Sequence, residues 1–302
     1  MIRLPAPRTH TVRSADGAEL HTEVYGPEGA PAVVLAHGWT CSLAFWAEQI
    51  RALAADHRVI AYDQRGHGRS PVPAAGGYST TALADDLEAV LAATLGPGER
   101  AVIAGHSMGG MTIMAAAGRP GFVQHAAAVL LCSTGPSRLT AEATVVPLGP
   151  GGLRTRLTGV VLGSKAPLGP VTVLSKKVLK YATMGPGSAP DRVDVCARIV
   201  HACPRPSRYG WSQVLAGLDL EAGVRDLRVP AAVLVGTADR LTPPVHSRAL
   251  AEALPHCTGL TELAGMGHMT PVEAPEAVTA QIRELTLTYL GARPTTSKEA
   301  RA

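Results

Sequence analysis

The sequence predicts an α/β fold in which a mostly parallel central sheet is covered by helices on both faces. Short, largely apolar runs are typical of strands buried on both sides. These runs are Ala32–Ala36, Arg58–Tyr62, Ala101–Ala104, Ala127–Leu131 and Ala231–Val235. Helical patterns separate the runs, and this alternation indicates a parallel sheet with crossover helices. The predicted helices are Leu43–Ala54, Thr81–Leu95, Met108–Ala117, Val245–Leu254 and Pro275–Leu290.

Further strands are predicted toward the two ends of the chain. Ala18–Tyr25 alternates between apolar and polar residues and follows the turn-forming pair Asp16 and Gly17. It could therefore pair with Arg8–Arg13 as a hairpin. Toward the C-terminus, Gly259–Leu263 is predicted to be a strand as well.

One long segment interrupts the alternation of strands and helices. Residues 135–225 contain no clear strand, although a crossover between parallel strands needs only about a dozen residues. In Val171–Tyr181, apolar residues fall on one helical face and three lysines on the opposite face. Asp191–Ala202 and Arg208–Leu218 are also predicted helices. We therefore expect a core made of residues 1–134 and 226–302, with residues 135–225 inserted as a helical lid.

Composition restricts the class of protein. Hydrophobic residues make up 46% of the 302 residues and charged residues 17%, so a mainly disordered chain is excluded. No apolar stretch is long enough to span a membrane, and Met1–His10 lacks the apolar segment of a secretion signal. Five scattered cysteines without a Cys-x-x-Cys pair suggest neither a disulfide framework nor a metal site. We expect a cytoplasmic enzyme without a metal or other cofactor. The sequence carries no signal for an oligomeric state.

The strongest motif is Gly-His-Ser-Met-Gly-Gly at residues 105–110. It lies between the predicted strand Ala101–Ala104 and the helix that begins at Met108. A Gly-x-Ser-x-Gly sequence in this setting forms a turn so sharp that the serine adopts a strained backbone conformation. The turn lifts the Ser107 hydroxyl above the sheet edge, and the following helix offers backbone N–H groups. Ser107 is therefore the candidate nucleophile, and it needs a base.

With this motif, residues 10–290 resemble the α/β-hydrolase superfamily of serine hydrolases. That family orders its catalytic triad as Ser, acid and His. The resemblance implies that Asp239, in the loop after Ala231–Val235, is the acid. It also implies that His268, in a Gly-rich loop after Gly259–Leu263, is the general base. The implied mechanism is attack of Ser107 on a carbonyl carbon, followed by hydrolysis of the acyl-enzyme.

Two backbone donors are expected to bind the oxyanion. One is the N–H of Met108, the residue after the nucleophile. By resemblance, the other is the N–H of Trp39, which follows Gly38 in the loop after Ala32–Ala36. Trp39 and Met108 are therefore also the expected contacts to the substrate, with Trp39 as a wall of the pocket.

Other polar residues near these motifs are assigned supporting roles. His37 is expected to be a structural hydrogen-bonding residue, and His106 to point to the other side of the turn. The stretch from Asp63 to Ser70 matches the family as a shaped loop, which we interpret as scaffold. Asp219 and Glu221 lie away from any predicted strand end, so neither is favoured as the acid.

The expected lid indicates the substrate class. Its first half is rich in Leu and Val, which favours an apolar acyl group unless these residues only attach the lid to the core. We therefore expect hydrolysis of a carboxylic ester, lactone or thioester of an apolar small molecule. The alternatives are a C–C bond hydrolase, a biosynthetic tailoring enzyme, or a non-catalytic binder of small molecules. A cofactor-free perhydrolase is less favoured, because Thr40 stands where those relatives often carry proline.

The net charge of +4 is unevenly distributed. Residues 135–225 hold 12 basic and 5 acidic residues, a balance of +7, and the rest of the chain is at −3. This distribution argues against a nucleic-acid partner. It suggests either a solvated lid face or a preference for anionic substrates or surfaces near the pocket. The polar residues 292–302 are expected to be frayed.

Overall fold

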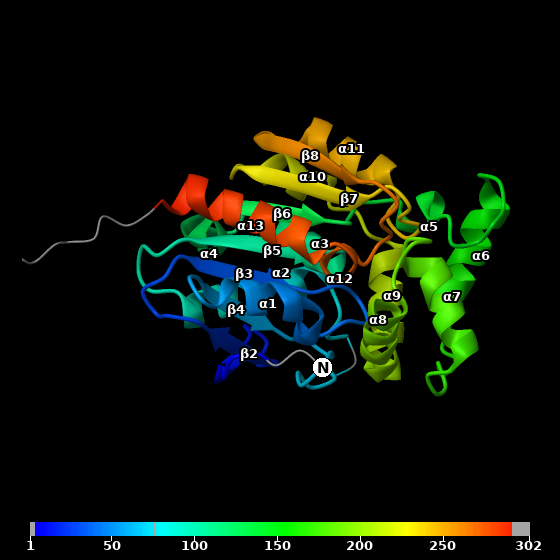
Figure 1. The fold of residues 1–302 in the computed structure, drawn as a ribbon, viewed down its shortest axis with the longest axis horizontal. Helices are drawn as coiled ribbons and strands as arrows, with labels where there is room; N and C mark the ends of the chain where they lie inside the picture. The colour runs from blue at the N-terminus through cyan, green and yellow to red at the C-terminus, as the bar shows by residue number, and fades with distance from the viewer. Residues whose placement is uncertain (1–3, 75, 292–302) are drawn as a thin grey trace, which may run out of the picture.

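A computed structural model describes residues 4–74 and 76–291 and confirms the predicted mostly parallel sheet covered by helices. One eight-stranded sheet runs through the molecule in the order β1-β2-β4-β3-β5-β6-β7-β8 (Figure 1). β1 and β2 form an antiparallel hairpin, β2 pairs with β4 antiparallel, and all later pairings are parallel. The strands are β1 Arg8–Arg13, β2 Glu19–Tyr25, β3 Ala32–Ala36, β4 Arg58–Tyr62, β5 Ala101–His106, β6 Ala126–Cys132, β7 Ala231–Gly236 and β8 Cys257–Leu263. Each predicted strand is present within two residues of its expected bounds.

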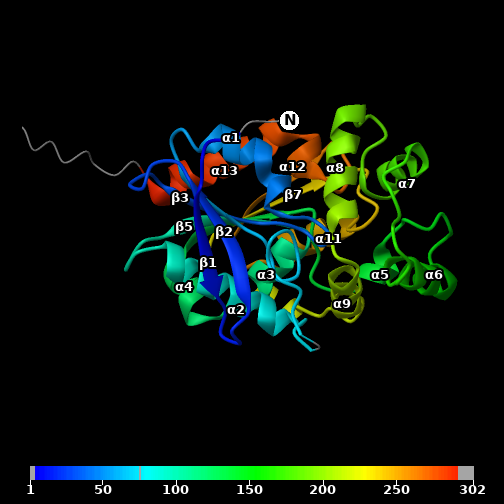
Figure 2. The same cartoon turned by 90° about the horizontal axis from the view of Figure 1, so that it is seen from below.

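Helices cover both faces of this sheet, as predicted (Figures 1 and 2). Outside the long insertion they are η1 Leu43–Trp46, α1 Ala47–Leu53, α2 Thr80–Thr94, α3 Met108–Ala116, α4 Pro120–His125, α11 Pro244–Ala253, α12 Thr270–Glu273 and α13 Pro275–Leu290. The predicted helix Leu43–Ala54 is thus a 3₁₀ turn followed by α1. The short helix α4 was not predicted. It begins at Pro120, and proline is favourable in a helix only in the first turn.

Alternate residues of the central strands contribute to two hydrophobic clusters, one on each face of the sheet. Val34 of β3 packs in the cluster with α2 and α3. Val33 and Leu35 pack in the other cluster, with α1 and α13. Because successive side chains of a strand point to opposite faces, a strand covered on both sides is apolar at every position. This explains why β3 could be predicted to the residue.

Between β6 and β7, helices joined by loops are the regular structure, with one isolated β-bridge between Ser137 and Asp219. Its helices are α5 Leu139–Glu142, α6 Gly152–Leu162, α7 Val173–Thr183, α8 Pro190–Ala202, α9 Arg205–Ala216 and α10 Glu221–Asp226. Both views show α6 to α9 gathered at one end of the molecule (Figures 1 and 2). α10 packs against α3, where a Cβ on Gly223 would lie 2.1 Å from the Met114 carbonyl oxygen. The division into a core and a lid stays a prediction.

Helix α7 is amphipathic as predicted, but its apolar face is turned to solvent. Val173 and Leu174 are each 71% exposed, and Val178 is 59% exposed. Lys176 and Lys180 are turned inward to α8 and the segment before it, whereas Lys177 is exposed beside the apolar residues and not on the opposite face as expected. Lys176 forms an ion pair with Asp194 at 2.8 Å, and Lys180 donates to the Ser188 carbonyl oxygen. Val173, Leu174 and Val178 therefore do not attach this helix to the core, whereas Leu179 packs against the hydrophobic cluster with α1 and α13.

Within residues 4–74 and 76–291, no helix has the length and apolar character to cross a membrane. The expected frayed segment 292–302 lies outside the described residues.

Candidate active site

The structure places Ser107 in a sharp turn between β5 and α3. Its φ of 52° and ψ of −115° are strained for a residue with a side chain. The turn is possible because glycines allow close backbone contacts on both sides. A Cβ on Gly105 would lie 2.4 Å from the Gly109 carbonyl oxygen, and one on Gly109 would lie 2.1 Å from that of Ala36. The predicted strand–turn–helix setting of the motif is therefore present.

Asp239 and His268 meet in direct contact at the same sheet edge. Asp239 follows β7 and His268 follows β8, and both are buried. The His268 Nδ1 atom lies 2.8 Å from Asp239 Oδ2. Asp239 also accepts hydrogen bonds from the N–H groups of Leu241 and Thr242 and from the Thr242 hydroxyl. These donors hold the carboxylate in place, where it accepts a hydrogen bond from the Nδ1–H of the imidazole and leaves Nε2 free.

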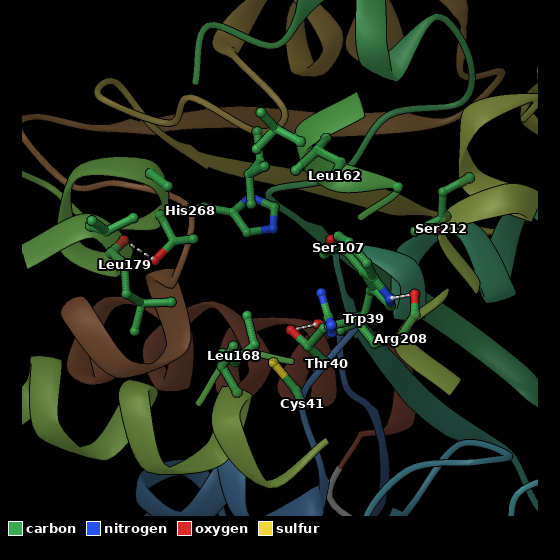
Figure 3. Close-up of a pocket in the computed structure, with 18 of the residues that line it drawn as sticks. Trp39, Thr40, Cys41, Ser107, Leu162, Leu168, Leu179, Arg208, Ser212 and His268 are labelled. Atoms are coloured by element: carbon green, nitrogen blue, oxygen red, sulfur yellow. Dashed lines mark hydrogen bonds between the residues drawn. The ribbon is translucent and has the colours of Figure 1, made fainter. Parts of the chain in front are cut away.

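Ser107 and His268 line one cavity of about 740 Å³. Figure 3 shows the two side chains facing the same open space, with Trp39 and Thr40 close to Ser107. The loops that follow parallel strands all lie at the carboxyl-terminal edge of the sheet, where ligands bind in open α/β sheets. The structure therefore brings together Ser107, Asp239 and His268. In the sequence, 132 positions separate Ser107 from Asp239, and 29 positions separate Asp239 from His268.

The N–H groups of Trp39 and Met108 are available as donors. Within the described part of the chain, neither has a hydrogen-bond acceptor, whereas the next N–H, that of Thr40, donates to His67 Nε2. Gly38 holds this loop against the turn, since a Cβ there would lie 3.1 Å from the Ser107 Cβ. The Met108 side chain itself is fully buried in the hydrophobic cluster with α2 and α3, while Trp39 lines the cavity.

The cavity is walled mainly by apolar residues of the insertion. These include Leu162, Leu168, Leu174, Val178 and Leu179. The Trp39 indole N–H donates to the Arg208 carbonyl oxygen at 3.1 Å, which ties the loop after β3 to α9. The Arg208 guanidinium donates in turn to the carbonyl oxygens of Ser164 and Ala166. Arg208 therefore stabilises the cavity wall, because its guanidinium group is hydrogen-bonded to backbone carbonyl groups.

Two buried histidines join the loops after β3 and β4. His37 Nε2 accepts from the Gln64 N–H, and His67 Nε2 accepts from the Thr40 N–H. Burial lowers the pKa of His37 to about 4 and that of His67 to about 3. Both imidazoles are therefore neutral at pH 7, and the structural role predicted for His37 is confirmed.

His106 is closer to the site than expected. It was predicted to point to the other side of the turn, but its ring packs against that of His268, with centroids 4.8 Å apart. Its Nε2 donates to the His268 carbonyl oxygen at 2.8 Å, and burial holds its pKa well below the usual value. His106 thus supports the loop that carries His268.

The loop from Asp63 to Ser70 is scaffold, as predicted. Arg65, almost fully buried, pairs with Asp86 at 2.5 Å and with Asp16 at 2.7 Å. Asp63 accepts from the N–H groups of Leu43 and Arg69, which shapes the same loop. None of these side chains lines the cavity. Asp219 and Glu221 are also absent from the cavity wall, and Glu221 instead accepts from the Ser137 hydroxyl.

Glu273 was not among the predicted site residues. This buried carboxylate accepts from the N–H groups of Gly267 and Met269, on either side of His268. It also accepts from the N–H of Gly185 and the hydroxyl of Ser188, both in the insertion. One side chain thus fixes the His268 loop and the insertion to each other. In the sequence, the only sign of this role is the presence of an acidic residue within the otherwise apolar stretch 271–275.

Within the described residues, no group of three or more His, Cys, Asp or Glu side chains could hold a metal ion.

Comparison with known proteins places this arrangement in a family. A family model described as the alpha/beta hydrolase family matches residues 33–281. RutD of Stutzerimonas stutzeri, named for carbamate hydrolysis, is 28% identical over 85% of this chain and 92% of its own. RutD of Variovorax paradoxus is 48% identical, but over only 30% of this chain and 34% of that protein.

A lactonase and an esterase are similar over most of their lengths. The 3-oxoadipate enol-lactonase 2 of Acinetobacter baylyi is 25% identical over 87% of this chain and 91% of its own. The solved structure of the esterase RhEst1 from Rhodococcus sp. ECU1013 covers 93% of this chain and 99% of that one. It does so with a TM-score of 0.77 and 24% identity.

Proposed function

Because the chain belongs to the alpha/beta hydrolase family, we propose that it hydrolyses carboxylic esters or lactones of apolar small molecules through an acyl-enzyme on Ser107. The observation that carries this proposal is the buried contact of 2.8 Å between Asp239 and His268, a histidine that lines the same cavity as Ser107. A base that is oriented by a carboxylate and lies near a strained serine is the arrangement that activates a hydroxyl nucleophile.

The proposed reaction has two stages. His268 Nε2 removes the proton from the Ser107 hydroxyl as its oxygen attacks the carbonyl carbon. The N–H groups of Trp39 and Met108 bind the negative oxygen, and His268 then protonates the departing alkoxide. Water, activated by His268, next attacks the ester carbon on Ser107 and releases the acid. General base catalysis contributes about 10²–10⁴ in rate, and each oxyanion donor about 10²–10³.

Asp239 stays ionised throughout this reaction. Its three further donors hold the carboxylate in place, so it keeps the imidazole in the tautomer that leaves Nε2 free. It also stabilises the positive charge that His268 acquires in each stage.

The cavity wall supports an apolar substrate. Aliphatic side chains of the insertion supply much of this wall, and the polar Arg208 uses its guanidinium on backbone carbonyl groups. Residues 135–225 would then act as a lid that selects the acyl group. The likeness to an enol-lactonase and to an esterase supports a cyclic or open ester. All five cysteines are free, which suits a reducing cytoplasmic location.

The test is turnover of short-chain p-nitrophenyl esters by the wild-type protein and by Ser107→Ala. We expect release of p-nitrophenol by the wild type and a loss of at least about 10³-fold in kcat for Ser107→Ala. Ser137→Ala, which removes a partly exposed hydroxyl that is absent from the cavity wall, should match the wild type. Equal turnover by Ser107→Ala, or none by the wild type on esters and lactones alike, would contradict the proposal.

A further inference from the structure

Two helices of the insertion present apolar side chains to solvent. On α7, Val173, Leu174, Val178 and Tyr181 lie on one face, exposed by between 43% and 71%. On α6, the exposed apolar residues are Leu153, Leu157, Val160 and Val161, and Leu153 is 66% exposed. Soluble monomers seldom display so many large apolar side chains close together, so this surface suggests a partner. We call these residues, with Leu168 and Val171 between the helices, the α6–α7 face.

Basic side chains accompany this face, and acidic ones are missing from it. Residues 143–190 contain six basic and no acidic residues. At 3.6 residues per turn, Lys177 falls among the exposed apolar residues of α7, and Arg156 borders those of α6. Both are exposed, and the structure records no ion pair for either within the described residues. An apolar helix face with basic borders is the composition that binds to anionic lipid surfaces.

The positive charge of the α6–α7 face indicates which kind of partner binds there. A second copy of the chain would place two positive surfaces against each other, which is unfavourable when they are desolvated. An anionic bilayer instead offers negative head groups to the basic side chains and an apolar interior to the valines and leucines. We propose that the α6–α7 face docks the protein onto an anionic phospholipid surface.

This docking face includes the opening of the cavity. Val161, Leu168, Leu174 and Val178 are both exposed to solvent and part of the cavity wall. The cavity that holds Ser107 and His268 therefore opens within the apolar surface. On a bilayer, an apolar compound dissolved in the lipid would reach the cavity without crossing water. Docking itself does not depend on the chemistry proposed for Ser107.

The experiment is flotation of the full chain with vesicles. We use phosphatidylcholine alone or mixed with phosphatidylglycerol, at low and at high salt. We expect strong binding to the anionic vesicles, weak binding to the neutral ones, and a loss of binding as salt screens the charges. Lys177→Gln should lower the partition coefficient about fivefold, the factor that corresponds to ~1 kcal/mol per basic side chain.

Apolar variants separate docking from folding and from activity. Val173 and Val160 are exposed and do not line the cavity. Val173→Asp with Val160→Asp should lower anionic-vesicle binding by at least about tenfold, since less apolar area is buried and negative charge is added. Turnover of a water-soluble p-nitrophenyl ester should not change. The matched control is Leu287→Asp. The Leu287 side chain is 75% exposed. It belongs to the C-terminal part of α13, which lies at the opposite end of the molecule from α6 and α7 (Figure 1). This variant should bind vesicles like the wild type.

Three results would overturn the proposal. They are no binding to anionic vesicles, equal loss of binding in Leu287→Asp, and a dimer in solution that Val173→Asp dissociates. The last result would make a second copy the occupant. Vesicle binding without ester turnover would contradict the proposed function alone, and ester turnover without vesicle binding would contradict the docking proposal alone.

Discussion

At the scale of single residues, the account depends on the charge of Asp239. Its carboxylate receives four hydrogen bonds, from His268 Nδ1, two backbone N–H groups and the Thr242 hydroxyl. An amide in its place would keep the size of the side chain but could hold the imidazole in the wrong tautomer. The effect of that change on turnover is the first prediction.

We expect Asp239→Asn to lower kcat by roughly 10⁴-fold with only a small change in KM, because the misplaced proton blocks His268 as a base. Steady-state kinetics on a p-nitrophenyl ester measure both constants. Asp219→Asn is the control, since Asp219 is absent from the cavity wall. An Asp239→Asn variant with near-normal kcat would show that another group orients His268.

Glu273 acts through the positions of its neighbours. Glu273→Gln would turn one acceptor oxygen into a donor, so at least one of the N–H groups of Gly185, Gly267 and Met269 would lose its partner. We expect unfolding in urea to show a loss of about 1–3 kcal/mol. We also expect kcat to fall while KM is nearly unchanged, because the His268 loop shifts. Glu276→Gln, at an exposed position of α13, is the control for the loss of a negative charge. A stability loss with unchanged kcat would limit Glu273 to a structural role.

At the scale of elements, the site depends on loops at the carboxyl ends of strands. The loop after β3 carries Trp39, and two neutral imidazoles join it to the loop after β4. A protonated imidazole could not accept these backbone N–H bonds. Burial penalises the charged imidazoles most strongly, so the folded protein resists protonation of His37 and His67, and their pKa values are lowered to about 4 and about 3.

This linkage predicts that acid destabilises the fold below the ordinary histidine pKa of about 6.5. Between that pH and pH 4, the unfolded chain binds protons that the folded chain does not, so stability falls as pH falls. Each such histidine contributes about 1.4 kcal/mol per pH unit. Urea unfolding from pH 7 to pH 5 measures the slope.

The variant His67→Gln keeps a side-chain acceptor but cannot be protonated in this range. Averaged from pH 7 to pH 5, its slope should be smaller than that of the wild type by about 1 kcal/mol per pH unit, because the unfolded histidine is only partly protonated above pH 6. His10→Gln replaces an exposed histidine and should leave the slope unchanged. Stability that stays constant from pH 7 to pH 5, or equal slopes in wild type and His67→Gln, would contradict the account of these loops.

At the scale of the whole molecule, the sheet and the site were largely predictable. The strands β3 and β4 match their predicted bounds because burial on both faces leaves a continuous apolar run. The positions of Ser107, Asp239 and His268 follow from topology, since loops after parallel strands reach one edge. Their meeting at one edge of the sheet could thus be predicted without knowledge of side-chain contacts.

What could not be predicted depends on contacts between distant segments. The pattern in α7 gives the period of its apolar face but not the direction of that face, which points to solvent. Glu273 accepts hydrogen bonds both from residues 85 and 88 positions away in the sequence and from residues four and six positions away. No local pattern encodes such a connection. The contact of His106 with His268 likewise arises only when β5 and β8 are placed in one sheet.

The most direct test of the central claim is the site of acylation. The protein is mixed with an excess of p-nitrophenyl acetate, quenched in acid, digested and analysed by mass spectrometry. The account predicts one acetyl group on the peptide that contains Ser107 in the wild type, and none in Ser107→Ala or His268→Ala. Acetylation of another residue, such as Cys41 in the cavity wall, or ester turnover in Ser107→Ala, would contradict it.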